Sequence, residues 1–134
     1  MTLPTTLTFE IPNQFWMSSN DRYPHWAVGN ERKKWLRGQG YGAALLNGAQ
    51  YDKPVHVTAW IGYPTNGTAD PSNAAPTLKA LIDGMTSAGT WIDDDHTHLI
   101  GPDYRRDVVK APRGFHTVRL EIRELETASK GGSN

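Results

Sequence analysis

Two stretches of the chain, 55–62 and 117–123, alternate between apolar and polar residues with the period of a β-strand. Since successive side chains of a strand point to opposite faces, each stretch predicts a strand with one buried face. A shorter stretch, 6–11, predicts a third strand. The residues expected to face inward are Val55, Val57, Ala59, Ile61, Val118, Leu120 and Ile122.

Two other stretches have the spacing of an α-helix. The clearest helix is predicted over 74–87, because four apolar residues recur at i, i+3, i+4 and i+7. Asn73 is expected to cap its N-terminus, and Pro76 falls in the first turn, where the missing N–H costs little. A second helix is predicted over 31–46, although its glycines weaken it by up to about 1 kcal/mol each relative to alanine. The expected apolar anchors are Leu78, Leu81, Ile82 and Met85 in the first helix, and Trp35, Leu45 and Leu46 in the second.

Strand fragments are further expected at 98–100 and 108–110. Strands mixed with two main helices predict a single small α+β domain, in which helices pack on a mixed, mostly antiparallel sheet. The domain is expected to span residues 1–125. The last residues, 126–134, end in Lys-Gly-Gly-Ser-Asn and are expected to form a flexible C-terminal tail.

Composition narrows the class of protein. The 134 residues fit one domain, and the absence of cysteine excludes disulfides and every cysteine-based metal or thiol site. No apolar run is long enough for a membrane span, and the N-terminus shows no secretion signal. A cytoplasmic protein is therefore expected. The formal net charge of zero argues against a polyanion binder that works by bulk charge.

The charges are nevertheless unevenly distributed. Residues 21–37 carry five basic and two acidic side chains, so +3, and residues 105–123 carry six basic and two acidic, so +4. Between them, residues 70–95 carry five acidic side chains and one lysine, so −4. A metal-dependent enzyme that acts on a phosphate backbone needs both signs. Ordinary scatter of surface charge is the alternative interpretation.

The acidic region holds the candidate chemistry. Asp70 stands at the junction of a loop and the predicted helix, and three adjacent aspartates, 93–95, follow that helix after a tight turn. If the chain turns back there, Asp70 and one or two of these aspartates face a shared cation, for which Mg²⁺ is suited. Lys79 and Asp83, four residues apart, lie within reach of each other. Each feature also has a purely structural explanation as a turn, a cap, a solvated ion pair or a solvated loop.

Four segments carry a family resemblance. Asp70–Asn73 reads Asp-Pro-Ser-Asn, Lys79–Met85 reads Lys-Ala-Leu-Ile-Asp-Gly-Met, and Ala88–Asp94 reads Ala-Gly-Thr-Trp-Ile-Asp-Asp. Near the N-terminus, Ser19–Tyr23 reads Ser-Asn-Asp-Arg-Tyr. Together these resemble the Asp-x-Asp-Asn, Lys-Ala-x-x-Asp, Ala-Gly-x-(Trp/Leu)-x-Asp-Asp and Ser-Asn-Asn-Arg-Tyr segments of RusA-type Holliday-junction resolvases, which are common in phages and prophages.

The resemblance implies a small homodimer that resolves branched DNA by nicking four-way junctions symmetrically. It implies Mg²⁺, or alternatively Mn²⁺, as the cofactor, no organic cofactor and no membrane partner. The expected location is the cytoplasm, which is that of the bacterial host if a phage encodes the chain. By the same resemblance Asp70 and Asp94 match metal carboxylates, Lys79 the catalytic lysine and Asn73 the motif asparagine. Asp93 and Asp83 match further acidic positions, and Asp93 is a candidate metal ligand.

Three departures from the family pattern stand out. Ser72 replaces the second aspartate of the motif, so the site loses one negative charge. Three extra residues separate Asn73 from Lys79, which leaves Lys79 at nearly the same azimuth if they extend the helix. The run 65–69 lacks the arginines usual in the family. DNA contact is therefore expected from Arg22, Lys33, Lys34, Arg105 and Arg106.

Three rival interpretations remain open. The chain is either an active nuclease or a catalytically weak or silent junction-binding protein that keeps the fold. His96 and His98, with Asp93 and Asp95, would form a different metal site if strand alternation placed both histidines on one face. The tryptophans would provide either a stacking surface for unpaired bases or apolar packing; the candidates are Trp16, Trp26 and Trp35.

Overall fold

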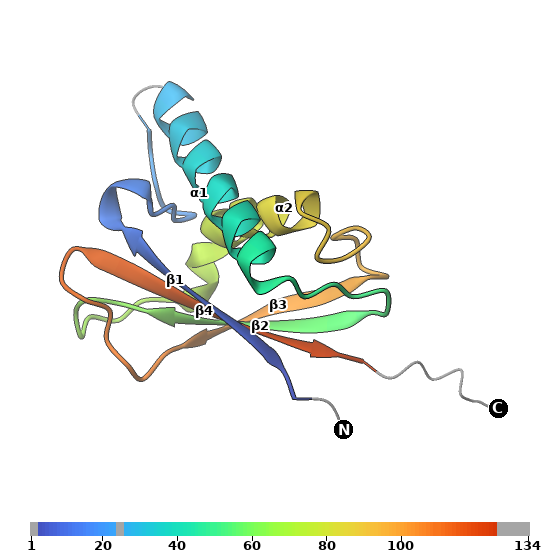
Figure 1. Ribbon diagram of the computed structural model, residues 1–134. Helices are drawn as coiled ribbons and strands as arrows, with labels where there is room; N and C mark the ends of the chain where they lie inside the picture. The colour runs from blue at the N-terminus through green and yellow to red at the C-terminus, as the bar shows by residue number, and fades with distance from the viewer. Residues whose placement is uncertain (1–2, 24–25, 126–134) are drawn as a thin grey trace.

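The computed structural model describes residues 3–23 and 26–125, and Figure 1 shows two helices above one sheet. The predicted tail, 126–134, lies outside the described residues. The elements in chain order are β1 (Thr5–Pro12), the 3₁₀ helix η1 (Asn13–Phe15), α1 (Trp26–Asn47), β2 (Val55–Gly62), the 3₁₀ helix η2 (Pro71–Ala74), α2 (Ala75–Ser87), β3 (Leu99–Arg106) and β4 (Phe115–Glu124).

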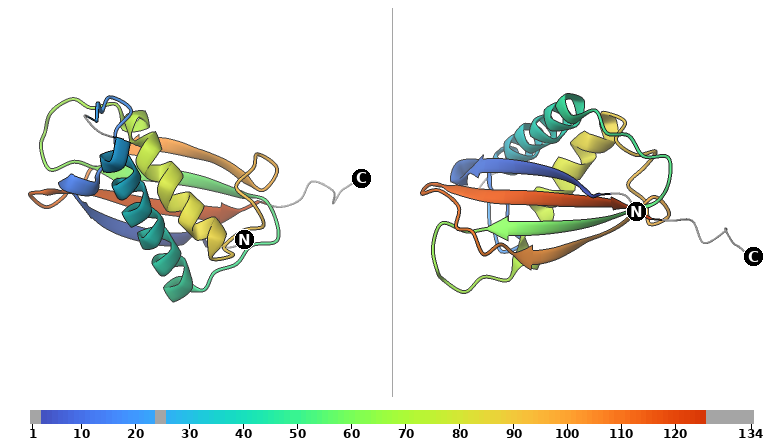
Figure 2. Two further views of the ribbon diagram at one scale, coloured as in Figure 1. Left: turned by 90° about the horizontal axis from the view of Figure 1, so that it is seen from above. Right: turned by 60° about the horizontal axis from the view of Figure 1, so that its bottom comes forward.

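The four strands form one mixed sheet in the order β1-β4-β2-β3. β4 is antiparallel to both β1 and β2, whereas β2 and β3 are parallel, because the chain crosses over through α2 between them. Both helices cover the same face of the sheet (Figure 2). This architecture confirms the predicted α+β class with a mostly antiparallel sheet. Neither helix within the described ranges is long and apolar enough to cross a membrane.

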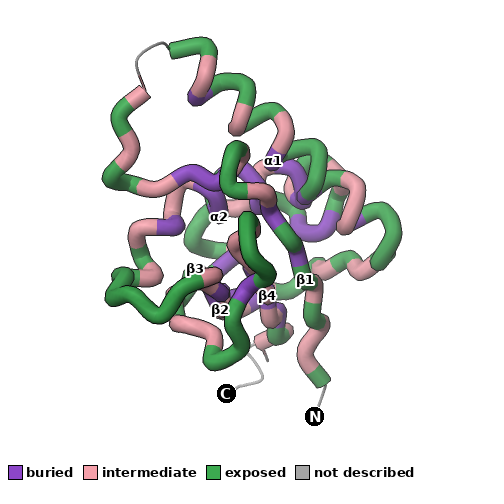
Figure 3. Tube along the Cα trace, turned by 90° about the vertical axis from the view of Figure 1, so that its left-hand side faces the viewer, coloured by how far each residue is buried: buried purple, intermediate pink, exposed green. Residues whose placement is uncertain are grey.

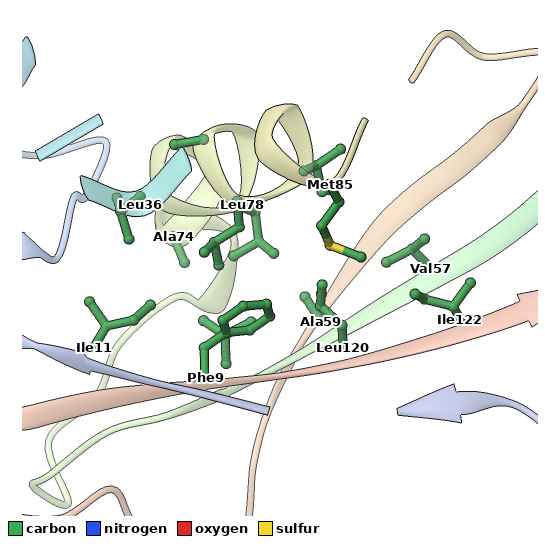
Figure 4. Close-up of a cluster of buried hydrophobic side chains, with 14 of the residues drawn as sticks. Phe9, Ile11, Leu36, Val57, Ala59, Ala74, Leu78, Met85, Leu120 and Ile122 are labelled. Carbon is green, nitrogen blue, oxygen red and sulfur yellow. The ribbon is translucent and has the colours of Figure 1, made fainter. Parts of the chain in front are cut away.

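The core lies between the helices and the covered face of the sheet, where the buried stretches of the trace gather (Figure 3). Every residue predicted to face inward from the two alternating strands is buried. Phe9 and Ile11 of β1 complete the sheet's contribution, and Leu36 of α1 comes from above (Figure 4). The apolar face of α2 is also confirmed: Leu78, Leu81, Ile82 and Met85 are all buried.

Helix α1 differs from the helix that was predicted over 31–46. It begins at Trp26 rather than Glu31, and the expected anchors Leu45 and Leu46 are 58% and 91% exposed. Leu36 and small residues face α2 instead. A Cβ at Gly40 would collide with the Leu81 carbonyl of α2, so the glycine allows the two helices to approach closely. The glycines that weaken the helix therefore serve its packing.

The start of α2 also differs from its prediction. Asn73 does not cap the helix: Ala74 occupies that position, with no side-chain hydrogen bond. Asp70 caps the preceding 3₁₀ helix η2 instead, because its carboxylate accepts from the Ser72 amide. The motif segment is therefore wound into its own tight turn before α2 begins.

Of the two further strand fragments that were predicted, 98–100 coincides with the start of a longer strand and 108–110 is wrong. A single strand, β3, runs from Leu99 to Arg106, and 108–110 lies outside the strands. β3 forms the edge of the sheet, pairs with β2 alone among the described strands, and carries a register shift opposite His56 and Thr58. An edge strand with a single buried residue lacks the apolar alternation that marks buried strands.

Candidate active site at the start of α2

Two hollows flank the start of α2. The first, called here the lysine hollow, has a volume of about 450 Å³ and is lined by Ser19, Pro76, Lys79, Ile82, Asp94 and Tyr104, among others. The second, called here the aspartate hollow, has a volume of about 430 Å³ and is lined by Trp16, Asn20, Tyr63, Asp70, Asn73 and His116, among others. The predicted catalytic residues are thus divided between two neighbouring hollows.

In the lysine hollow, Lys79 lies between two carboxylates. Its Nζ is 3.3 Å from Asp83 Oδ1, one helical turn along α2, and 3.8 Å from Asp94 Oδ2, in the turn that follows the helix. The predicted reach between Lys79 and Asp83 is confirmed. The Lys79 side chain is 72% exposed, so both pairs are weak and the ammonium is available to another anion.

The three adjacent aspartates have different environments. Asp94 is the one whose carboxylate meets Lys79. Asp93 Oδ1 accepts the Asp94 amide at 2.7 Å. Asp95 Oδ1 accepts the Thr97 hydroxyl at 2.6 Å and lies 2.8 Å from His98 Nδ1. These hydrogen bonds, first that of Thr97 and then that of His98, lower the pKa of Asp95 to about 2. Asp93 and Asp95 therefore shape the turn that presents Asp94.

In the aspartate hollow, Ser72 holds Asp70. Both the Ser72 hydroxyl and the Ser72 amide donate to Asp70 Oδ1, at 2.8 and 3.0 Å. The hydroxyl first and the amide second lower the pKa of Asp70 below its ordinary value. Ser72, which departs from the motif that the segment resembles, thus stabilises the charged form of Asp70.

The segment 16–20 connects the two hollows. The Met17 amide donates to Thr77 Oγ1, and the Thr77 hydroxyl donates back to the Met17 carbonyl, both at 2.8 Å and both buried. The Ser19 amide donates to the Asn73 carbonyl at 2.8 Å. Asn73, predicted as a catalytic residue, thus contributes its main chain to this tether and lines the aspartate hollow.

The residues fit a magnesium ion only in part. Over residues 3–23 and 26–125 no group of three or more histidine, cysteine, aspartate or glutamate side chains is placed to hold a metal. Asp70 and Asp94 line different hollows, and Asp93 is engaged in its turn. Two carboxylates suit a largely hydrated Mg²⁺, because magnesium accepts one or two protein carboxylates and keeps several waters. That Asp70 and Asp94 share one ion remains a prediction.

The predicted DNA-binding side chains have different surroundings. Arg22, Lys33, Lys34 and Arg105 are exposed. Arg106 is half-buried: its guanidinium donates to the Gly67 carbonyl at 2.7 Å and the Thr65 carbonyl at 3.0 Å, and lies over the Tyr63 ring. Arg106 therefore fastens the loop that leads to Asp70, and its role as a DNA contact remains untested.

The structure does not contain, among its described residues, the strand on which the alternative histidine metal site was based. Residues 96–98 form a turn rather than a strand, so alternation does not place His96 and His98 on one face. His98 is already 2.8 Å from Asp95. Two of the tryptophans pack as the structural interpretation expects: Trp16 stacks on His116 and Trp35 on Phe15, whereas Trp26 is 73% exposed.

Two residues of the hollows were missed by sequence reasoning. Tyr104 lines the lysine hollow and His116 lines the aspartate hollow. Burial raises the pKa of Tyr104 and lowers that of His116, since each shift favours the neutral form. Neither residue stands in a motif. Their positions depend on the register of β3 and β4, which the sequence alone does not reveal.

Neither the protein-family models nor the curated proteins searched contain a match to this chain.

Proposed function

We propose that this chain is a metal-dependent endodeoxyribonuclease of RusA type that resolves four-way DNA junctions by symmetric nicking. The observation that carries the proposal is the meeting of Lys79 and Asp94, whose charged atoms are 3.8 Å apart at a hollow. They come from two of the segments that carry the resemblance, and the Asp70 motif immediately precedes the same helix.

The role of Lys79 follows from its environment. Asp83 and Asp94 hold its ammonium at the lysine hollow, and its exposure leaves room for a phosphate to displace either weak pair. A cation held there stabilises negative charge that develops on the phosphate or on the leaving oxygen, an effect of about 2–4 kcal/mol for one such group.

The carboxylates supply the metal-binding part of the proposal. Asp94 and Asp70 would hold Mg²⁺, or Mn²⁺ in its place, while Asp93 and Asp95 keep the turn in shape. When bound, the metal supplies polarisation of the phosphodiester and a more acidic water. Ser72 supports this role of Asp70, because its two hydrogen bonds stabilise the charged carboxylate.

The substrate symmetry suggests the assembly. A four-way junction has an approximate two-fold axis, and a homodimer would present two equivalent sites to it. Recognition would rest on phosphate contacts and branch shape rather than base sequence, with exposed Arg22, Lys33, Lys34 and Arg105 as the candidate contacts. A cytoplasmic location belongs to the same proposal.

A cleavage assay on a synthetic four-way junction tests the proposal. The wild type is expected to nick opposing strands in Mg²⁺ and to leave a linear duplex of the same sequence intact. Asp94→Asn and Asp70→Asn keep the shape of each side chain and remove its charge, and both are expected to lose most of the activity. Variants that cut as fast as the wild type would show that the site is assigned wrongly.

The second candidate is a junction-binding protein without catalytic activity. Ser72 in place of an aspartate favours it, as does the lack of arginine in the run 65–69. Tight binding of the junction with no nicking in either Mg²⁺ or Mn²⁺ would support this candidate over the nuclease.

A further inference from the structure

The lysine hollow combines two kinds of surface. Pro76, Ile82 and Pro102 give it apolar walls, and Tyr104 adds an aromatic ring. Lys79 and Asp94 contribute the charged groups. Sites that bind small organic groups are commonly of this kind, mostly apolar with a few polar groups that fix orientation.

Tyr104 is the aromatic residue of this hollow. It lies on β3, opposite Ala59 of β2, and its half-buried ring packs against the core, which fixes its position. Its hydroxyl has no hydrogen-bond partner among residues 3–23 and 26–125, yet it is not sealed from solvent. The ring is therefore held in place while its polar end remains available.

In the aspartate hollow, by contrast, none of the described aromatic rings is free to receive a planar group. Its rings already contact one another or a cation: His116 stacks on Trp16 at 4.3 Å between ring centroids and meets the edge of Tyr63 at 5.5 Å. Arg106 lies 4.7 Å from the Tyr63 centroid. A planar group would have to displace these contacts to stack there, whereas no aromatic or cationic partner of Tyr104 is found among the described residues.

We propose that the lysine hollow receives one unpaired nucleobase of the DNA strand whose phosphate meets Lys79, and that Tyr104 is the residue on which this base stacks. A nucleotide joins a flat ring to an anion, which matches an aromatic wall beside an exposed ammonium. A base inside a duplex cannot enter a pocket without leaving the stack, and this cost is smaller where stacking or pairing is already incomplete, as at an opened branch point. The inference rests on the proposed function, which supplies the DNA junction as the ligand, but it requires only that the chain binds the junction and not that it cuts it.

The test uses four-way junctions that carry 2-aminopurine at single positions around the branch point, with EDTA present so that no strand is cut. The wild type is expected to change the fluorescence at one position, and to leave the same base in a linear duplex unchanged. Tyr104→Leu is expected to abolish that change and to weaken junction binding by about tenfold or more, the range measured for loss of one stacked base. Tyr104→Phe keeps the ring and is expected to behave as the wild type.

Two further variants control for folding and location. Tyr41→Leu removes an exposed tyrosine of α1 that does not line the hollow, and is expected to leave binding and fluorescence unchanged. Ser19→Trp fills the hollow from an exposed position, without touching the core, and is expected to reproduce the loss.

The outcomes separate the two proposals. A wild type that shows the fluorescence change but never nicks in Mg²⁺ or Mn²⁺ keeps the base pocket and overturns the nuclease. A wild type that nicks while Tyr104→Leu and Ser19→Trp bind normally overturns the base pocket alone. A wild type that binds no junction overturns both.

Discussion

The two hollows beside the start of α2 are similar in volume and built for different tasks. In the lysine hollow Lys79 is exposed beside a half-buried Asp94, the walls are mostly apolar, and the aromatic ring has no ring partner among those described. In the aspartate hollow the rings stack on one another, and the carboxylate of Asp70 is held by Ser72. The difference indicates that the lysine hollow can receive an incoming group, whereas the contacts in the aspartate hollow mainly fix the position of the Asp70 carboxylate.

Both hollows depend on the same anchor. The reciprocal hydrogen bonds between Met17 and Thr77, with the Ser19–Asn73 bond beside them, fix the segment 16–20 against α2. Substitutions of Lys79 and Asp94, which lie outside this anchor, should therefore change chemistry alone. Substitutions at the anchor should change both hollows together.

The largest effect is expected from Lys79→Ala, which removes the positive charge of the lysine hollow. Cleavage of a four-way junction should fall by about 100-fold, since one such electrostatic group contributes about 2–4 kcal/mol to a transition state. Single-turnover kinetics at saturating protein measures this. Asp83→Asn removes the other partner of Lys79 and is the matched control, expected to change the rate little because an exposed i,i+4 pair is weak. Equal losses in both variants would show that Asp83 matters as much as Lys79, which contradicts its assignment as a weak surface partner.

Thr77→Val is expected to disturb both hollows. It leaves the Met17 amide and carbonyl buried without their partner, which costs about 1–3 kcal/mol of the free energy of unfolding. Urea denaturation measures the loss, and Thr77→Ser, which keeps the hydroxyl, should recover most of it. An unchanged midpoint in Thr77→Val would show that segment 16–20 is held by other contacts.

Ser72→Ala tests the hydrogen bond from the Ser72 hydroxyl to Asp70 beside the aspartate hollow. The wild-type pKa of Asp70 is lowered, so this carboxylate favours the folded state above its ordinary pKa, and the contribution is lost as the pH falls through the folded pKa. Losing the Ser72 hydroxyl should move the pKa of Asp70 back toward its ordinary value, with the amide bond retained. Carbon NMR titration of the carboxylate measures this shift, with Ser87→Ala as an exposed control. A pKa of Asp70 that does not move would mean that the hydroxyl is not its main partner.

The smallest effect is expected at the turn that presents Asp94. Thr97→Val removes the strongest hydrogen bond to Asp95 and should raise its pKa above the present value of about 2. In the wild type the charged Asp95 should therefore stabilise the turn until the pH falls toward 2. In the variant this stabilisation should be lost at a higher pH. The same NMR titration follows both proteins, and identical curves would contradict the assigned hydrogen bond.

Much of the fold follows from local patterns in the sequence. The alternation around Val57 and Leu120 predicts two strands, and the spacing from Leu78 to Met85 predicts α2, because burial of one face leaves a period in the sequence. Only the start of the edge strand β3 was predicted, and the exposed end of α1 at Leu46 was predicted wrongly, since neither position follows such a period. Only the partner helix explains why Gly40 is tolerated in α1.

The candidate site was predictable to a similar extent. Helical spacing alone places Lys79 beside Asp83. The resemblance points to both Lys79 and Asp94, but only the structure shows that the two meet. Which of the three adjacent aspartates meets the lysine depends on hydrogen bonds within a turn, and the contribution of Tyr104 depends on strand register. Both are tertiary properties that leave no mark in a single sequence.

The most direct test of the central claim, that Lys79 and Asp94 act as one reacting centre, is a double-mutant cycle on junction cleavage. Single-turnover rates in Mg²⁺ are compared for the wild type, Lys79→Ala, Asp94→Asn and the double variant. The account predicts that each single variant loses most of the activity and that the double variant is hardly slower than the slower single, because groups that act as a unit are not additive. Losses that multiply, or single variants that cut like the wild type, would contradict it.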